Sequence, residues 1–217
     1  MEQLNEKELR LLLVKNSNYD LAKAEKLYNF VIGEQPKEPK PDGIYFILSP
    51  DKFIHESMAT DVEKHCSIAV GVKMGDKFAN VVLHDAAGGE YLALCLGDKV
   101  PCGSEQFFRW TFNKAMADWD GMASTNDMRD SLNPDINLGE NEYIPSVAQL
   151  HLILLNINEV NKALVEAGGE PMEDKWYWSS TENSSNEAWS MYFDGGNTYN
   201  YDKYYCNVVR PSVSVKF

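Results

Sequence analysis

The chain has 217 residues, 44% of them hydrophobic, which is enough to fill the core of one large domain or of a moderate domain with a small appendage. Its formal net charge is -13. Because this charge repels phosphates and no cluster of Lys and Arg opposes it, nucleic acid and anionic membrane surfaces are poor partners. The apolar run at residues 11–14 is short and surrounded by charge, so we expect no signal peptide and no membrane insertion. The absence of a targeting signal leaves the location open, and the cytoplasm fits.

Two short helices and a linker are predicted before the main domain. Between residues 5 and 32, Asn18 and Asp20 can separate and cap the two helices. The second helix is supported by apolar residues at three- and four-residue spacings, namely Leu21, Ala24, Leu27, Tyr28 and Val31. The run GEQPKEPKPDG that follows is rich in Pro, Lys and Glu, as linkers are. We therefore divide the chain into a helical segment over 1–33, a linker over 34–42 and a main domain over 43–217.

The first part of the main domain is predicted to hold strands and then helices. Four short runs rich in β-branched and aromatic residues, GIYFILS, CSIAVGV, FANVVLH and EYLALCL, are separated by charged or Gly-containing turns, as strands are. Between residues 104 and 132, apolar residues recur at helical spacing, with Gly121 as the interruption between two helical segments. We expect these residues in the core: Phe108, Phe112, Ala115, Trp119 and Met122.

The second part returns from helices to strands. Ser146 can cap a helix through VAQLHLILL, and a further helix is expected from Ile157 to Ala167, ended by Gly168 and Gly169. From Lys175 onward we expect strands over about 176–179, 188–193 and 208–215, joined by long polar loops. Helices and strands are thus segregated along the chain, which predicts an α+β fold.

The cysteines and histidines show no metal-binding pattern. Cys66, Cys95, Cys102 and Cys206 contain no CxxC pair, and no zinc-finger spacing joins them to a histidine. We expect free buried thiols, with a disulfide between Cys95 and Cys102 as the alternative if the protein is displayed outside a cell. The four histidines, at positions 55, 65, 84 and 151, are scattered. We therefore predict no metal site and no cofactor.

The end of the chain has the composition of a binding surface. Five of the eleven tyrosines lie between Tyr192 and Tyr205, among Asn, Ser, Asp and Gly residues. Tyrosine gives a large contact area at low rotamer cost, and small polar residues give adaptable hydrogen bonds, as in antibody combining sites. Exposed aromatic residues at this density usually mark a contact site, so we expect the loop at 197–205 to bind a ligand.

Alternation along SMYFDG predicts a strand with one buried and one exposed side. Met191 and Phe193 are expected in a core, and Ser190, Tyr192 and Asp194 in solvent. The alternating tryptophans just upstream are expected to fill a core rather than to contact a ligand; they are Trp176, Trp178 and Trp189.

Four segments, YIPSVAQLHLI, ALVEAGG, YWSSTENSSNEAWSMYF and NVVRP, resemble the C-type-lectin-fold variable proteins of diversity-generating retroelements, within the broader formylglycine-generating-enzyme-like group of that fold. The resemblance covers 104–217 well and 43–103 only by strand order. It implies a C-type lectin fold with a variable region over about 177–211. In such proteins, rewritten adenines in Asn-type codons give Asn, Tyr, Ser, Asp, Gly or Cys at solvent-facing positions, and this tail has the same repertoire.

By this resemblance, thirteen ligand-binding positions are variable: Asn183, Asn186, Ser190, Tyr192, Asp194, Asn197, Tyr199, Asn200, Tyr201, Asp202, Tyr204, Tyr205 and Asn207. The resemblance also implies seven invariant residues, hereafter the frame residues: Trp178, Ser179, Ser180, Trp189, Phe193, Arg210 and Pro211. From the frame positions we expect an ion pair between Arg210 and Glu182. The Glu-Pro-Asn and Trp-Asn-Asp motifs that bind calcium in sugar-binding lectins are absent, and we expect Asp194 and Asp202 in solvated loops.

The expected function is ligand binding of the receptor or adhesion type, without catalysis. The resemblance implies a phage or bacterial protein, carried on a phage particle or brought to a cell surface by a nonclassical route, whose partner is a protein or glycan on a cell surface. The N-terminal helices are expected to attach the chain to a larger assembly. One alternative is a formylglycine-generating-type oxidase, although such enzymes use two cysteines near the end of the domain and only Cys206 lies there. The other alternative is a structural protein whose tail makes a fixed subunit contact.

Overall fold

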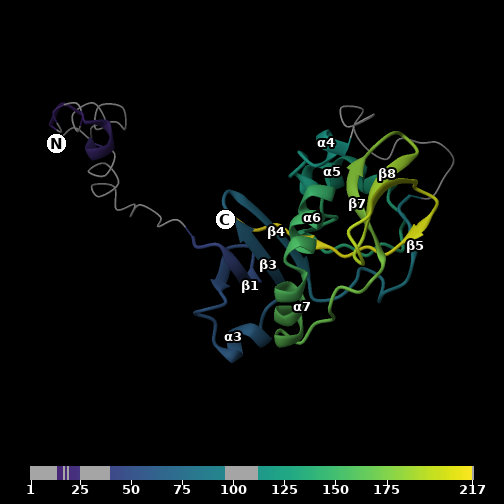
Figure 1. The fold of residues 1–217 in the computed structure, drawn as a ribbon, viewed down its shortest axis with the longest axis horizontal. Helices are drawn as coiled ribbons and strands as arrows, with labels where there is room; N and C mark the ends of the chain where they lie inside the picture. Colours follow the sequence, from purple (N-terminus) through teal and green to yellow (C-terminus); the bar gives the residue numbers. More distant parts are fainter. Residues whose placement is uncertain (1–13, 17, 19, 25–39, 96–111, 217) are drawn as a thin grey trace. The chain divides into compact units, whose positions relative to one another are not determined.

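The computed structural model describes residues 14–16, 18, 20–24, 40–95 and 112–216 (Figure 1). The chain forms two compact units, Met1–Pro41 and Asp42–Phe217. The division falls at the end of the predicted linker, and most of that linker lies outside the described residues. The three-part domain organisation therefore stays a prediction.

In the first unit, the boundary between the two predicted helices has the expected local chemistry. Asn18 has a left-handed backbone, with φ of 56°. The Asp20 side chain accepts a hydrogen bond from the backbone N–H of Lys23 at 3.1 Å, as an N-cap does, and helix follows at 21–24. Leu27, Tyr28 and Val31 of the predicted second helix lie outside the described residues.

The second unit begins with an antiparallel sheet of order β2-β1-β3-β4. Its strands are β1 (Gly43–Ser49), β2 (Lys52–His55), β3 (Ala69–Met74) and β4 (Lys77–Val82). Gly75, with φ of 60°, makes the tight turn between β3 and β4. A short helix, α3 (Asp61–His65), is started by a capping box between Thr60 and Glu63. Strands β1, β3 and β4 were predicted, whereas β2 and α3 were not.

Helices follow the first sheet, and α6 joins it to the second. The described helices in this part are α4 (Phe112–Ala115), α5 (Gly121–Met128), the 3-10 helix η2 (Arg129–Ser131), α6 (Val147–Leu155) and α7 (Ile157–Glu166). Ser146 caps α6 as predicted, because its side chain accepts from the Gln149 backbone while the Gln149 side chain accepts in return. Helix α6 packs on β4 and on β8 of the second sheet, and α7 packs on β3 and β1 (Figure 1).

The second sheet has the order β7-β8-β9 and is antiparallel. Its strands are β7 (Trp176–Glu182), β8 (Glu187–Tyr192) and β9 (Thr198–Asp202). Two short ladders accompany it, one between β5 (Leu92–Ala93) and β10 (Cys206–Asn207), the other between β6 (Glu142–Tyr143) and β11 (Ser212–Val213). The chain is thus an α+β protein, as its sequence predicts.

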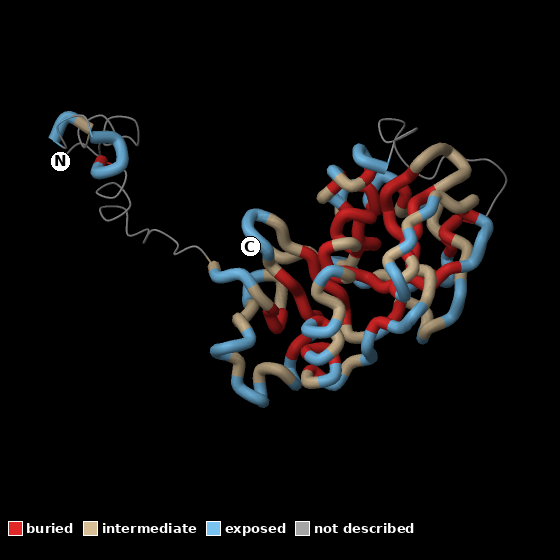
Figure 2. Tube along the Cα trace, viewed as in Figure 1, coloured by how far each residue is buried: buried red, intermediate tan, exposed pale blue. Residues whose placement is uncertain are grey.

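Buried residues lie on both faces of the second sheet, and Figure 2 marks the buried positions along the chain in red. The first core lies between the two sheets and α6, and includes Phe46, Leu150 and Met191. The second core lies on the opposite side of β7 and β8, around Trp178 and Met128. The second sheet is therefore packed on both faces over most of its length.

Two predicted strands and one predicted loop differ in the structure. The segment 197–205 was predicted as a loop, but it contains β9, because its Tyr-rich sequence satisfies β propensity despite its polarity. The predicted strand at 208–215 is reduced to β11, with Arg210 turned into the interior and Pro211 lacking an N–H. EYLALCL keeps only β5 among its described residues.

The cysteine prediction is wrong in part. Cys66 and Cys206 are free but exposed rather than buried. Cys95 is buried and disulfide-bonded. Cys102, the partner in the alternative that the sequence left open, lies outside the described residues. The chemistry of Cys95 is therefore that of a structural cystine and not of a free thiol.

The predicted core around residues 104–132 is confirmed only at some positions. Ala115 is fully buried, and Trp119 packs against the first core with the Lys77 ammonium 5.2 Å from its ring centroid. Phe112 is 47% exposed, because its ring meets only the edge of Trp189 from a helix of four residues. Phe108 lies outside the described residues.

No helix within the described residues is both long and apolar enough to cross a membrane.

Candidate ligand-binding surface

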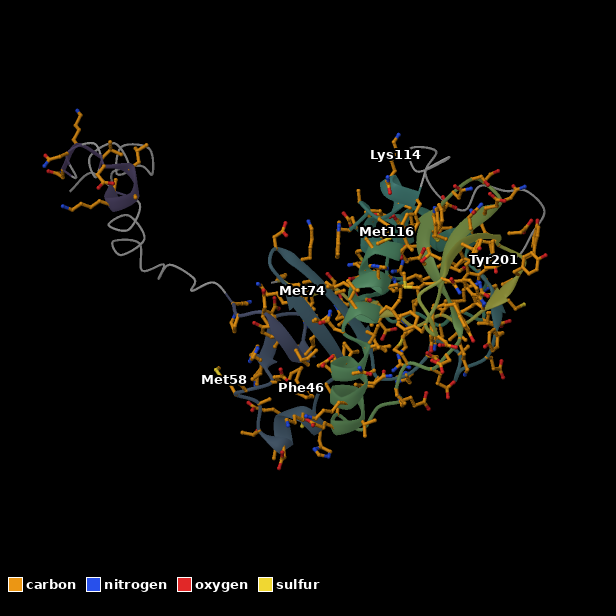
Figure 3. The ribbon with its side chains drawn as sticks, in the orientation of Figure 1. Phe46, Met58, Met74, Lys114, Met116 and Tyr201 are labelled. Carbon is orange, nitrogen blue, oxygen red and sulfur yellow. The ribbon has the colours of Figure 1, made fainter. Side chains whose placement is uncertain are left out.

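Five aromatic rings form a continuous cluster on one face of the second sheet, which we call the aromatic surface. Its members are Trp176, Tyr192, Tyr199, Tyr201 and Tyr205. Trp176 is at the centre: its ring centroid lies 5.3 Å from Tyr192 in a stacked pair, 5.0 Å from Tyr201 edge-on and 6.2 Å from Tyr199. Tyr205 extends the cluster, 5.7 Å from Tyr201. In Figure 3, Tyr201 of β9 lies far from Met58, which is in the segment between β2 and α3.

The strand register explains why these rings meet. Trp176 pairs with Tyr192 across β7 and β8, and Ser190 and Ala188 pair with Tyr199 and Tyr201 across β8 and β9. Residues that pair directly point to the same face of a sheet, so all these side chains share one face. On that face, Trp178 and Ala188 belong to the second core and are buried. The aromatic rings of the aromatic surface lie at the margin of this core.

The aromatic surface is accessible to a ligand. Tyr199 and Tyr205 are 58% and 63% exposed, and neighbouring Tyr204 is 43% exposed. Trp176, which the sequence placed in the core, is only partly buried, because the rings packed on it belong to the surface itself. Ring pairs in offset or edge-on contact hold one another in place, so a ligand meets a preordered surface.

The opposite side of the same strands anchors the surface to the first core. Tyr177, Met191 and Phe193 are buried, and Tyr177 packs edge-on against Phe193 at 5.0 Å. On the covered part of the aromatic face, the Trp178 indole N–H donates to the Leu92 carbonyl at 2.9 Å. The predicted core roles of Trp178 and Trp189 are thus confirmed, with exposures of 0% and 7%.

A buried ion pair fixes the end of β9. The Lys203 ammonium donates to Glu182 Oε1 and to the Ser185 carbonyl, the latter at 3.0 Å, and the two charged side chains are 4% and 2% exposed. Burial raises the pKa of Glu182 and lowers that of Lys203, against the attraction between them. The second oxygen of Glu182, Oε2, is buried without a hydrogen-bond partner. Each partner thus depends on the other to remain inside the protein.

Arg210 does not pair with Glu182, so that prediction is wrong. Its guanidinium donates to Asp85 Oδ1 at 3.1 Å, to the Val82 carbonyl at 2.9 Å and to the Glu170 carbonyl. Arg210 is 1% exposed, and burial raises the pKa of Asp85 despite this neighbour. Glu182 lies on β7 beside Lys203, which satisfies it instead. Arg210 therefore ties the last segment of the chain to the end of β4 and to the residues after α7.

The thirteen predicted ligand-binding residues divide by exposure. Five are exposed: Asp194, Asn197, Tyr199, Tyr204 and Tyr205. Six are partly exposed: Asn183, Asn186, Tyr192, Asn200, Tyr201 and Asp202. Two are buried and do not face solvent as predicted: Ser190 at 0% and Asn207 at 5%.

Ser190 and Asn207 are buried against each other. The Asn207 amide donates to Ser190 Oγ at 2.9 Å. Alternation does direct Ser190 away from Met191 and Phe193, but strand β10 covers that part of the face. A pattern of period two shows on which side a residue lies, and it does not show what covers that side.

The unpaired charges carried by the strands and turns of the second sheet are all acidic, and Glu187 and Asp202 pair with each other on the face opposite the aromatic surface. Among the described residues from 176 to 207, Glu187, Asp194 and Asp202 form no ion pair, whereas the sole cation, Lys203, is paired in the interior. Glu187 accepts instead from the side-chain amides of Asn183 and Asn200, at 2.7 and 3.0 Å. This charge distribution favours a ligand with positive charge.

The described part of the chain shows no group of side chains suited to a metal ion. No three His, Cys, Asp or Glu side chains there are grouped so that they could hold a metal ion. Asp202 Oδ1 accepts from the backbone N–H of Tyr204 at 3.0 Å and so shapes the turn after β9. Cys206 lies exposed in β10, opposite Ala93.

Comparisons of the chain with models of protein families and with curated proteins found no match. The partial exposure of Trp176 in the aromatic surface and the pairing of Lys203 with Glu182 were not predicted from the sequence. A signal for the second was present, because Lys203 is the only basic residue in a run of tyrosines and acids.

Proposed function

We propose that this protein is a ligand-binding module of the C-type lectin fold, similar to the variable proteins of diversity-generating retroelements. The aromatic surface carries the proposal: five rings in mutual contact on a sheet that is packed on both faces elsewhere. Tyr and Trp bring large contact area with few rotatable bonds, which is why they dominate binding hot spots. The ligand in this proposal is a protein or glycan on a cell surface.

The division between frame and variable residues supports the proposal. All seven frame residues are buried, while eleven of the thirteen proposed variable residues are at least partly exposed. The frame hydroxyls are used internally: Ser179 Oγ donates to the Trp189 carbonyl at 2.7 Å. Because the fold depends on the frame residues, the scaffold tolerates changes in the variable residues at its surface.

The nucleotide sequence of the gene tests the proposal of diversification. We expect Asn-type codons, or their derivatives changed at adenine only, at the eleven exposed positions, a near-copy of this region in the flanking sequence, and a reverse transcriptase gene beside it. Ordinary codon use at these positions with no near-copy nearby would refute diversification and leave a binder of fixed specificity.

A display experiment tests the separation of scaffold and surface independently of the gene. Two libraries of the full chain would be compared, one randomised at exposed variable positions such as Tyr199 and Asn197, the other at buried frame positions such as Trp178 and Ser179. We expect most members of the first library to resist protease as the parent does, and most members of the second to be digested. Equal protease sensitivity of the two libraries would contradict the separation of scaffold and surface.

The oxidase alternative makes a different prediction at Cys206. An enzyme that uses this thiol loses its activity when Cys206 is replaced by Ser, whereas a binding module keeps its ligand affinity. The exposed position of Cys206 in β10, outside the five-ring cluster, supports the binding interpretation.

A further inference from the structure

The outer edge of β9 has backbone groups that are free for pairing. In the β8–β9 ladder, the N–H of Tyr192 donates to Asn197 and the N–H of Lys203 donates to Asn186, which fixes every second pair as hydrogen-bonded. By this alternation, Tyr199 and Tyr201 direct their backbone groups to β8, and Thr198 and Asn200 direct theirs away from it. Because β9 is the last strand of its sheet in the described part of the chain, those outward groups meet no further strand there.

Among the described residues, the outer edge of β9 has no Lys, no Pro, no bulge and no covering strand, and Asp202 is its one charged residue. Natural edge strands carry Lys, Pro or a bulge, or are covered by another element. Strand β9 reads TYNYD, without Lys or Pro, and its register with β8 runs without a shift over all five pairs. Within the described residues, the backbone N–H and carbonyl groups of Thr198 and Asn200 have no hydrogen-bond partner. An added strand would supply one.

We infer that the partner contributes an extended peptide segment that carries Arg or Lys side chains and pairs with the outer edge of β9. This inference rests on the proposed function, and it names the chemistry of the ligand at the same surface. Strand addition gives affinity through the main chain and specificity through alternate side chains. In the added strand, the side chains that point to the aromatic face would contact Tyr199 and Tyr201, which belong to the edge strand β9.

Charge selects the composition of the added segment. The unpaired charges of Glu187, Asp194 and Asp202 are all negative, and the whole chain carries -13. Arg and Lys side chains gain from the carboxylates on one side of the edge and from the faces of the tyrosine rings on the other. The structure already contains such a contact, because the Lys175 ammonium lies 6.0 Å from the ring centroid of Tyr91.

The same charges disfavour a second copy of this chain as the added strand. A second copy would bring the unpaired carboxylates of both chains, and a net charge of -13 on each, to one interface, and this repulsion destabilises the pairing. A glycan, in turn, lacks the regular N–H and carbonyl spacing that pairs with Thr198 and Asn200. An extended basic peptide fits both the ladder and the charge.

Selection from a library of random linear peptides tests the inference with the full chain. Peptides would be selected on the wild-type protein at physiological salt and counter-selected on the double variant Tyr199→Ala/Tyr205→Ala. We expect tyrosine-dependent peptides enriched in Arg and Lys and without Pro in their central residues. Binding should weaken as salt rises, because opposite charges attract less when screened.

A proline at position 200 then tests strand pairing itself. Asn200→Pro removes an N–H that β8 does not use, and Pro is tolerated at such edge positions. We expect the selected peptides to bind Asn200→Pro at least about tenfold more weakly than Asn200→Ser, because both variants lose the amide contact to Glu187 and only the Pro variant loses the N–H. N-methylation of alternate peptide amides gives the same test without changing the protein, and hydrogen exchange at Thr198 and Asn200 should slow when peptide binds.

The outcomes separate the two proposals. Tyrosine-dependent peptides without basic enrichment, or peptides insensitive both to Asn200→Pro and to N-methylation, would overturn edge pairing and leave the aromatic surface as the binding site. If the edge of β9 is occupied by a second copy of this chain, and peptides bind only by displacing that copy, the partner is the chain itself and the inference is overturned. If no peptide and no cell-surface protein or glycan binds in a tyrosine-dependent way, the proposed function fails as well.

Discussion

Replacement of Lys203 by Met should strongly destabilise the protein, because it leaves the Glu182 carboxylate buried without its cation. Glu182 is 2% exposed, its Oε2 already has no partner, and the Ser185 carbonyl also loses its 3.0 Å hydrogen bond. Breaking a buried pair by removal of one partner costs about 3–5 kcal/mol, a large share of the roughly 5–15 kcal/mol that keeps a domain folded. Urea unfolding followed by tryptophan fluorescence measures the loss.

Two control variants make the test specific. In Lys203→Met/Glu182→Met both charges are gone, so most of the lost stability should return, to within about 2 kcal/mol of wild type. Lys175→Met breaks the more exposed pair with Glu173 and should cost less than about 1 kcal/mol. A single variant that loses under 1 kcal/mol, or a double variant as unstable as the single, would refute the reasoning.

The destabilisation should also depend on pH. Burial raises the pKa of Glu182, and loss of the Lys203 cation raises it further. In the variant the folded state therefore binds a proton more tightly than the unfolded state, so its stability increases as pH falls toward and through the folded pKa. The gap between Lys203→Met and wild type should be smaller at pH 5 than at pH 8.

Three further predictions follow from contacts described above. Arg210→Met leaves Asp85 buried without its guanidinium and should cost about 3–5 kcal/mol in thermal unfolding, and recovery in Arg210→Met/Asp85→Leu would identify the buried charge as the cause. Tyr205→Ala, at 63% exposure, should change stability by less than about 0.5 kcal/mol and yet remove binding of selected ligands, measured by calorimetry. Ser146→Ala removes the capping box of α6 and the hydrogen bond to the Asp118 carbonyl at 2.6 Å and should cost about 1–2 kcal/mol in urea, unless the cap is replaced by water.

Sequence patterns predicted the elements whose signals are local. Ser146 before VAQLHLILL gave the start of α6, and the glycines after Ala167 gave the end of α7, where Gly168 has φ of 83°. These signals depend on a few adjacent residues and on backbone hydrogen bonds within one helix. Strand β1 was predicted for a similar reason, since its apolar run is bounded by turns.

Features that depend on distant segments were not predictable from one sequence. The partner of Arg210 is Asp85, 125 residues away, and no local pattern distinguishes it from Glu182. Ser190 was expected in solvent, and it is β10, near the end of the chain, that covers it. For β9, strand propensity and loop composition gave opposite indications, and pairing with β8 decided the outcome.

The position of Lys203 sets a limit on how the tyrosine-rich tail can change over generations. Its side chain reaches Glu182 in the interior only because it stands at a fixed number of residues after β8. Insertion or deletion of one residue in β9 would turn every following side chain to the opposite face and bring this ammonium into solvent while Glu182 stays inside. Substitutions at the outward-facing positions of this segment are therefore compatible with the fold, whereas insertions and deletions are not.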